Sequence, residues 1–240
     1  MGRLAARRMA AAGAAVAAID VNEPGLRETA SASDRIRTFA LDVTDARAVA
    51  QRVREVEAAF GPIDRVYNAA AIMPTALLME QELDVVHRIM AINYGGVVNV
   101  TYATLPGMLE RGAGELVNLA SIAGWLPTPH FGAYNASKFA VVAFSEVLYH
   151  ENRGKGVKIA CVCPPPVATP LLDQAKSRPR VLEQPGMGPI KPEAVLDDVE
   201  RALARGQLWV FPGRGTSLIW RLRRWVPGLV WSNLHRIEGV

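Results

Sequence analysis

Short apolar runs alternate with longer segments of helical periodicity along most of this chain. The short runs predict strands at 14–20, 36–41, 63–70, 115–120, 157–163 and 207–211. The longer segments predict helices at 2–12, 23–31, 45–60, 133–152 and 191–204, with one more long helix within 80–111. Thr44 is the predicted cap of the 45–60 helix. Alternation of this kind is typical of βαβ units and a parallel sheet with helices on both faces.

The most informative residues are Tyr134 and Lys138, four positions apart in a predicted helix and therefore on one face of it. An ammonium about 4 Å from a phenol, at an effective dielectric of about 20, favours the phenolate by up to about 4 kcal/mol, or roughly 3 pKa units. Tyr134 would then exchange protons with an alcohol or carbonyl. Ser121, upstream, could hold the same substrate oxygen. The tyrosine–lysine pair alone is weak evidence for a catalytic site, since these residues at this spacing usually form a half-buried ring beside a solvated amine.

Polar residues fall at or near the carboxyl ends of the predicted strands. Asp20, Asp42, Asn68 and Ser121 all have this position. Ligands of open parallel sheets bind along that edge, so these positions predict a nucleotide site.

The bulk composition predicts a single domain in a reducing compartment. The chain has 240 residues, half of them hydrophobic, and its longest apolar stretch (9–19) is too short to span a bilayer. No signal peptide is recognisable, which predicts a cytoplasmic protein. Cys161 and Cys163 lie two apart in a predicted buried strand, so they are expected to be core thiols that do not bond each other. We expect no metal site, because the chain has no C-x-x-C motif and no histidine cluster.

The net charge of +4 is concentrated in the last 27 residues. Segment 214–240 contains five arginines and one glutamate, which amounts to +4 and leaves residues 1–213 balanced. This distribution argues against a nucleic-acid surface. The tail also has an apolar stripe at helical spacing, formed by Leu218, Leu222, Trp225, Val226, Leu229 and Val230. Arginine and tryptophan beside such a stripe suit peripheral contact with a membrane through 214–236, although packing over a pocket or at a subunit interface is also open.

The Ser121, Tyr134 and Lys138 pattern, with Asn93 in Ile92-Asn93-Tyr94-Gly95, resembles the short-chain dehydrogenase/reductase family over nearly the whole chain. The resemblance implies a Rossmann-like, doubly wound fold and a homodimer or homotetramer. It implies that Tyr134 donates or accepts the proton, Lys138 lowers the tyrosine pKa, and Asn93 anchors a water relay behind the lysine.

The resemblance further implies a nicotinamide cofactor. Its implied contacts are Gly2, Asp20, Asp42, Val43, Asn68, Ala69, Ala70, Tyr134, Lys138, Pro164, Val167 and Thr169. Asp20 would accept hydrogen bonds from the adenosine ribose and repel a 2′-phosphate, so NAD is favoured over NADP. A plain turn or cap aspartate is the alternative reading of Asp20.

The chain departs from the family at its start. Only Met1-Gly2-Arg3 matches the end of the family's Gly-rich turn, and the first strand is absent. That strand should lie between 14–20 and 63–70, so its absence leaves two strand edges unpaired and the pyrophosphate without its cradle. We hypothesise that the sequence is truncated. Ala69, Ala71 and Pro165 also replace usual family residues, which affects cofactor affinity more than chemistry.

The expected activity is the interconversion of an alcohol and a ketone or aldehyde. Apolar residues flank the site, so a lipophilic substrate such as a steroid, retinoid or long-chain compound is predicted, with Trp125, His130 and Leu171 beside Ser121. His130 is also open to being a plain loop residue. Segment 171–190, rich in Pro, Gly and charge, is predicted to cover the site as a lid. The alternative is a non-catalytic binding or regulatory relative that has lost its cofactor.

Overall fold

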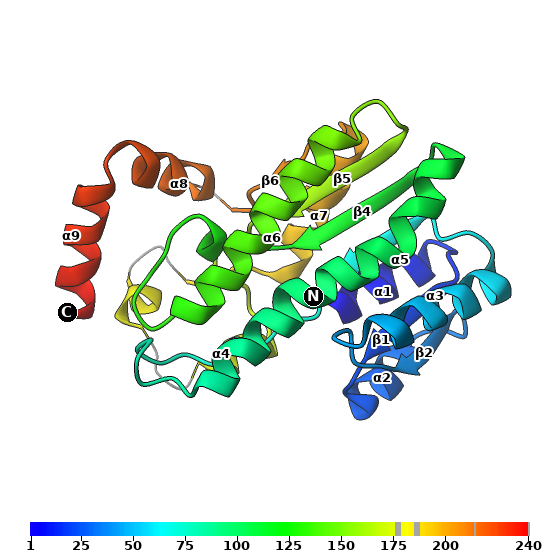
Figure 1. The fold of residues 1–240 in the computed structure, drawn as a ribbon, viewed down its shortest axis with the longest axis horizontal. Coiled ribbons are helices and arrows are strands. Elements are labelled where there is room, and N and C mark those ends of the chain that lie inside the picture. The colour runs from blue at the N-terminus through cyan, green and yellow to red at the C-terminus, as the bar shows by residue number, and fades with distance from the viewer. Residues whose placement is uncertain (176–178, 185–187, 214, 240) are drawn as a thin grey trace.

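The computed structural model describes residues 1–175, 179–184, 188–213 and 215–239. Its main sheet is parallel and has the strand order β3-β4-β5-β6 (Figure 1). The strands run over Arg65–Asn68, Gly114–Leu119, Val157–Val162 and Trp209–Val210. In the register of the two central strands, Leu116 is opposite Ile159 and Asn118 is opposite Cys161.

Helices cover both faces of this sheet because its strands alternate their side chains between two apolar cores. Leu116 and Ile159 pack on one face with residues of α5 (Gly96–Arg111) and α6 (Gly132–Glu151). Val117 and Ala160 pack on the other face with residues of α7 (Pro192–Ala204). Strands buried on both sides read as continuous apolar runs, which explains why the sequence predicts them.

A second, two-stranded sheet contains β1 (Val16–Asp20) and β2 (Ile36–Ala40), paired in parallel. No hydrogen-bonded pairing joins β1 to β3 in the part of the chain that the structure describes. Helix α1 (Gly2–Ala11) contacts both β1 and β3. The sheet is thus divided at the place where the sequence predicted an unpaired edge on each side.

The remaining helices complete the molecule. Next to the small sheet lie α2 (Glu23–Ala30) and α3 (Ala46–Phe60). The predicted long helix within 80–111 is divided into α4 (Leu83–Met90), the π-helix η1 (Ala91–Gly95) and α5. Short 3-10 helices follow at η2 (Ile122–Gly124), η3 (Pro170–Gln174) and η4 (Arg180–Glu183). The tail forms α8 (Thr216–Trp225) and α9 (Pro227–Glu238), which meet at a corner in Figure 1.

Two local predictions have clear outcomes. Asp45, not Thr44, caps α3, because its carboxylate accepts the N–H groups of Arg47 and Ala48 at 3.0 and 2.9 Å. Cys161 and Cys163 are buried and free, with their sulfur atoms 3.9 Å apart, as predicted.

Among the described residues, no helix is both long enough and apolar enough to cross a membrane, and no cluster of possible metal ligands is found.

Candidate active site

Three of the four predicted catalytic residues, Ser121, Tyr134 and Lys138, meet at the carboxyl end of β4, where they line a cavity of about 260 Å³. Ser121 follows β4 and caps η2, with its hydroxyl accepting the N–H of Ala123 at 3.1 Å. Tyr134 and Lys138 reach the same cavity from one face of α6. The spacing places Tyr134 and Lys138 on one face of α6, and the turn after β4 brings Ser121 to the same cavity.

Tyr134 is buried and hydrogen-bonded to the Ser121 hydroxyl. Burial raises the pKa of Tyr134 to about 12, and the hydrogen bond with Ser121 offsets only part of this rise. Lys138 does not contribute to this shift in the structure described, so its lowering of the Tyr134 pKa stays a prediction. The ammonium lies 5.7 Å from the centroid of the Tyr134 ring and donates instead to the Leu119 carbonyl at 2.8 Å.

Lys138 is buried as deeply as the tyrosine. Burial lowers the pKa of Lys138 to about 8, and the nearby thiols of Cys161 and Cys163 act in the opposite direction. The site therefore contains a tyrosine that resists ionisation beside a lysine that loses its proton easily. Such opposed shifts mark a place where proton transfer can be adjusted.

Asn93 lies in η1 and is fully buried. Its amide oxygen accepts the N–H of Ile72 at 2.8 Å, and its Nδ2 donates to the Ile72 carbonyl and to Ser137 Oγ, each at 3.0 Å. Ser137 Oγ in turn donates to the Tyr134 carbonyl at 2.8 Å. Asn93 thus ties the loop after β3 to the turn of α6 that carries the tyrosine, and a π-helix aims it there.

Asn135 is a positioning residue that the sequence analysis missed. Its Nδ2 donates to the carbonyls of Ala123 and Leu126 at 2.7 and 3.2 Å, and its Oδ1 accepts the N–H of Thr128 at 3.1 Å. The loop that begins at Ser121 is therefore fixed to α6. Adjacency to Tyr134 was the one available signal, because the partners of Asn135 are backbone groups.

Gly124 allows η2 to lie directly on α6. A Cβ built at Gly124 would be 2.7 Å from the Lys138 carbonyl oxygen and 2.8 Å from a methyl group of Val142. Only glycine permits this approach, which keeps Ser121 close to Tyr134.

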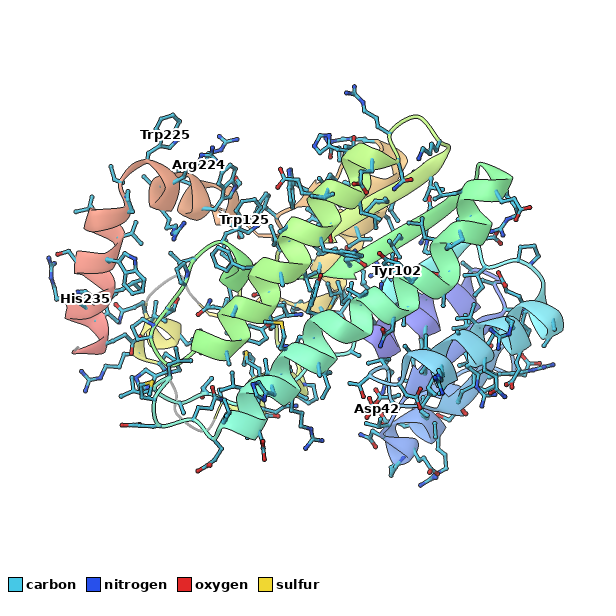
Figure 2. All side chains as sticks on the ribbon, viewed as in Figure 1. Asp42, Tyr102, Trp125, Arg224, Trp225 and His235 are labelled. Atoms are coloured by element: carbon cyan, nitrogen blue, oxygen red, sulfur yellow. The ribbon has the colours of Figure 1, made fainter. Side chains whose placement is uncertain are left out.

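The proposed cofactor residues lie at two places. Asp20 and Asp42 are exposed at the ends of β1 and β2, where their carboxylates accept the N–H groups of Asn22 and Thr44 at 3.0 and 2.9 Å. Figure 2 shows Asp42 on the side of the molecule that contains the small sheet. Val43, which follows Asp42, is fixed to α5, because Asn99 Nδ2 donates to the Val43 carbonyl at 2.8 Å.

The other cofactor residues surround the cavity. Gly2 lies against Ala69, with 3.4 Å between a Cβ built at Gly2 and the Ala69 Cβ, and Ala70 follows in the same loop. Ala69 lines the cavity, as do Pro164, Val167 and Thr169. Asn68 differs from the expectation: its side chain is buried and donates to Asn118 Oδ1 at 2.9 Å, so only its backbone is available to a cofactor.

The described parts of 171–190 close the cavity from one side. The apolar wall on this side is formed by Leu171 and Leu172 of η3 and by Val181 and Leu182 of η4. Gln174, which the sequence analysis missed, accepts the Met73 N–H at 2.9 Å and so connects η3 to the opposite rim. Residues 176–178 and 185–187 of the predicted lid lie outside the described residues.

Two expected substrate residues do not line this cavity. Trp125 packs against Trp209 and Trp220, each with ring centroids 5.1 Å away, and its indole N–H donates to Cys163 Sγ at 3.2 Å. Its position between the sheet and α8, labelled in Figure 2, explains why it turns away from Ser121. His130 has a positive φ of 68° and lines a separate cavity beside α8 and α9. Both lie near Ser121 in sequence, but the turn at η2 directs them elsewhere.

The fold and site agree with the comparison to known families. Residues 1–180 match the profile described as short chain dehydrogenase. The chain therefore belongs to the short-chain dehydrogenase family, and the family and Rossmann-like fold expected from the sequence are confirmed.

Curated relatives are 35–38% identical to the chain over the residues that align. A 2-dehydro-3-deoxy-L-rhamnonate dehydrogenase (NAD(+)) of Sphingomonas sp. is 38% identical over 175 residues, which cover 72% of this chain and 70% of the relative. A D-threitol dehydrogenase of Mycolicibacterium smegmatis is 38% identical over 184 residues, covering 75% of this chain and 71% of that protein. A 2-keto-3-deoxy-L-fuconate dehydrogenase of Xanthomonas campestris pv. campestris is 35% identical, and the match spans 72% of this chain but only 57% of that relative.

Solved structures extend the likeness to nearly the full length. A short-chain dehydrogenase of Streptomyces avermitilis superimposes with a TM-score of 0.81 at 28% identity, covering 98% of this chain and 93% of that one. A short-chain dehydrogenase/reductase of Burkholderia phymatum in complex with NAD has a TM-score of 0.82 at 26% identity, covering 95% of this chain and 91% of that one.

Proposed function

We propose that this protein is an NAD-dependent oxidoreductase that interconverts an alcohol with a ketone or aldehyde. The observation that carries the proposal is that the hydroxyl-bearing residues Tyr134 and Ser121 line one largely apolar cavity, with Lys138 beside them. An oxygen of the substrate placed between the two hydroxyls would meet a proton donor or acceptor and a second hydrogen-bonding group.

The residues each have a part in this chemistry. Tyr134 exchanges the proton with the substrate oxygen, and Ser121 stabilises that oxygen as its charge changes. Lys138 must supply positive charge near the tyrosine, because burial alone holds the tyrosine neutral at physiological pH. NAD, when bound, accepts or supplies the hydride. One relative is named as an NAD(+) dehydrogenase and one similar structure contains bound NAD, and both support this cofactor.

The residues present fit most of an NAD molecule. Asp20 offers an exposed carboxylate for the adenosine ribose, and no arginine follows it in Val21-Asn22-Glu23 to accept a 2′-phosphate. Thr169 and Val167 line the cavity where the nicotinamide would lie. The pyrophosphate region is supported least, since only Met1 and Gly2 at the start of α1 represent the Gly-rich turn.

The proposed substrate is lipophilic. Apart from Lys138, no charged side chain of the described residues lines the cavity, and Leu126, Phe131 and Leu172 contribute to an apolar wall. A carboxylate substrate would enter this space without a dedicated cationic partner and would lose its hydration. The relatives named above act, by their names, on polar sugar acids or polyols, so a substrate of that kind is the second candidate.

A lipophilic substrate partitions into bilayers, so the proposal includes peripheral membrane contact through 214–236. It also includes a homodimer or homotetramer built through α5 and α6. Tyr102 on α5 is 72% exposed, and Val147 on α6 is exposed as well, which supports these helices as an interface. A non-catalytic role has less support, because Ser121, Tyr134, Lys138 and Asn93 remain assembled.

The central test replaces Tyr134 with phenylalanine. Y134F should lower turnover by orders of magnitude while largely sparing NAD binding, because it removes only the proton-exchanging hydroxyl. NADH absorbance measures turnover, and tryptophan fluorescence measures NAD binding. The matched control is Y149F, the same substitution on α6 roughly 22 Å along the helix. Unchanged turnover in Y134F would remove the tyrosine from the mechanism.

The substrate class is tested on the wild-type enzyme. We expect long-chain secondary alcohols to be oxidised with a higher kcat/KM than D-threitol or a sugar acid. The reverse order would favour the polar substrates of the relatives. Activity with neither class, together with absent NAD binding, would favour the non-catalytic alternative.

A further inference from the structure

Helices α8 and α9 meet in a corner whose outer surface is apolar. We call the exposed residues Leu218, Leu222, Trp225, Val226 and Leu229 the tail corner. Trp225 is 80% exposed and Leu229 is 71% exposed. Figure 2 shows Trp225 projecting outward from the turn between the helices, with Arg224 beside it. Large apolar side chains gathered in this way mark a surface that meets something other than water.

The apolar surface continues beyond the tail. A cavity of about 550 Å³ lies beside the two helices, lined by Arg223 and Trp231 of the tail and by Leu78 from the loop before α4. Leu78 is exposed, and its neighbour Met79 is 95% exposed. Figure 1 shows α9 and the loop before α4 on the same side of the molecule. Two segments far apart in sequence therefore contribute exposed apolar residues to one side.

Positive charge accompanies this surface without acidic neighbours in the sequence. Arg221 and Arg224 are exposed on α8, and no aspartate or glutamate occurs between Glu200 and Glu238. Glu238 itself is buried, with its carboxylate accepting the N–H groups of Arg180 and Val181. Arg223 lies with its guanidinium 6.0 Å from the Phe139 ring centroid, and its Nε is buried without a hydrogen-bond partner.

We infer that the tail corner docks on the surface of a bilayer that contains anionic lipids. Trp225, Leu222 and Leu229 enter the boundary between headgroups and acyl chains, while Arg221 and Arg224 pair with lipid phosphates.

Charge decides between a bilayer and a second copy of the chain as the occupant. In a two-fold symmetric dimer through the tail corner, the patch of one copy would meet the same patch of the other. Arg221 and Arg224 would then face arginines, with no acidic residue between Glu200 and Glu238 to pair with them. An anionic bilayer presents an apolar layer for the exposed apolar side chains and negative charge for the arginines.

Docking would also place the proposed substrate cavity near the bilayer. Leu234, on the inner side of α9, packs with Leu126 and Val181, two residues of the cavity wall. The helix that bears Leu229 of the tail corner thus supports the wall of the site. This consequence rests on the proposed function, whereas docking itself can be measured without turnover.

The test is flotation of residues 1–240 with vesicles of phosphatidylcholine alone or mixed with phosphatidylglycerol. We expect binding to the mixed vesicles, weakening at high salt, and little binding to the neutral ones. The double variant R221Q/R224Q should weaken binding roughly 30-fold, on the basis of about fivefold for each arginine near an anionic surface. W225A should also reduce binding, through loss of the apolar anchor.

The matched control removes two exposed arginines elsewhere. R153Q/R205Q makes the same change of charge, with Arg205 before β6 and therefore at the end of that strand opposite to α8. Equal loss of vesicle binding in both double variants would show that the effect depends on net charge alone and would contradict the proposed docking site. Absence of vesicle binding also overturns it. If W225A instead lowers the mass measured by light scattering, the occupant is a second copy and the inference is wrong.

Discussion

At the scale of single residues, burial is the dominant influence on the proposed catalytic pair. Tyr134 and Lys138 both lose contact with water, and in each case the neutral form is favoured. The Lys138 ammonium was expected to favour the Tyr134 phenolate, but it donates its hydrogen bond to the Leu119 carbonyl. Desolvation is therefore the largest influence on the pKa of each group in this structure. A group that approaches both side chains during catalysis would change that balance.

The pKa of Lys138 predicts how stability depends on pH. From about pH 8 to about pH 9, folded Lys138 loses its proton while the unfolded lysine, with its ordinary pKa of 10.5, keeps it. The unfolded state then binds more protons, so the free energy of unfolding contributed by this group rises with pH, by about 1 kcal/mol over that interval. Denaturant titrations at both pH values should show a smaller rise in K138M than in the wild type.

The control for this prediction is K191M, which replaces an exposed lysine before α7. It should keep the wild-type pH dependence. If the free energy of unfolding rises with pH in K138M as much as in the wild type, the pH dependence comes from another group. Measurements stop near pH 9, because Tyr134 contributes with the opposite sign above about pH 10, where the unfolded tyrosine ionises first.

At the scale of elements, side chains fix the loops around the cavity by binding backbone groups. Asn135 holds the loop after η2, Gln174 holds η3, and Glu238 of α9 holds the start of η4. The cavity wall formed by η4 therefore depends on a helix almost sixty residues later in the chain.

Removing the Glu238 carboxylate should loosen η4. Its oxygens accept the N–H groups of Arg180 and Val181 at 3.0 and 2.8 Å, and hydrogen bonds to a charged, buried group contribute about 2 kcal/mol. E238A is expected to lower the free energy of unfolding by that amount and to speed amide hydrogen exchange at 180–182. The exposed E110A on α5 is the control. Unchanged exchange at 180–182 in E238A would contradict the role given to Glu238.

At the scale of the whole molecule, the division of the sheet is the main departure from a continuous doubly wound fold. The β1–β2 pair and the β3–β6 sheet are connected through α1 and loops rather than by hydrogen bonds between strands. Unpaired strand edges cost stability unless another group satisfies them. The same region also lacks most of the turn that would hold a pyrophosphate.

A parallel strand placed between β1 and β3 should therefore improve NAD binding. We predict that adding a strand and a Gly-rich turn ahead of Met1 lowers the Kd for NAD by tenfold or more, as measured by tryptophan fluorescence. A Gly/Ser extension of the same length is the control, since it cannot pair or pack. Equal affinity in all three proteins would show that binding tolerates the divided sheet.

Much of the fold and the centre of the site could be predicted because they depend on local patterns. Strand β5 was expected at 157–163 and runs over Val157–Val162, since a strand buried on both faces is a continuous apolar run. Tyr134 and Lys138 share a face because helical geometry requires it. In contrast, Trp125 was assigned to the substrate from its nearness to Ser121, and the packing of three tryptophans turned it away.

By itself, the sequence determined the order of strands and helices, the burial of Cys161 and Cys163, and the shared helix face of Tyr134 and Lys138. These follow from hydrophobic period and residue spacing, which act over a few residues. Only the tertiary structure decided the pKa of Tyr134, the placement of Trp125 and His130, and the bond from Glu238 to η4. Desolvation and packing depend on segments that are far apart in the chain, and their contact is not encoded in any local pattern.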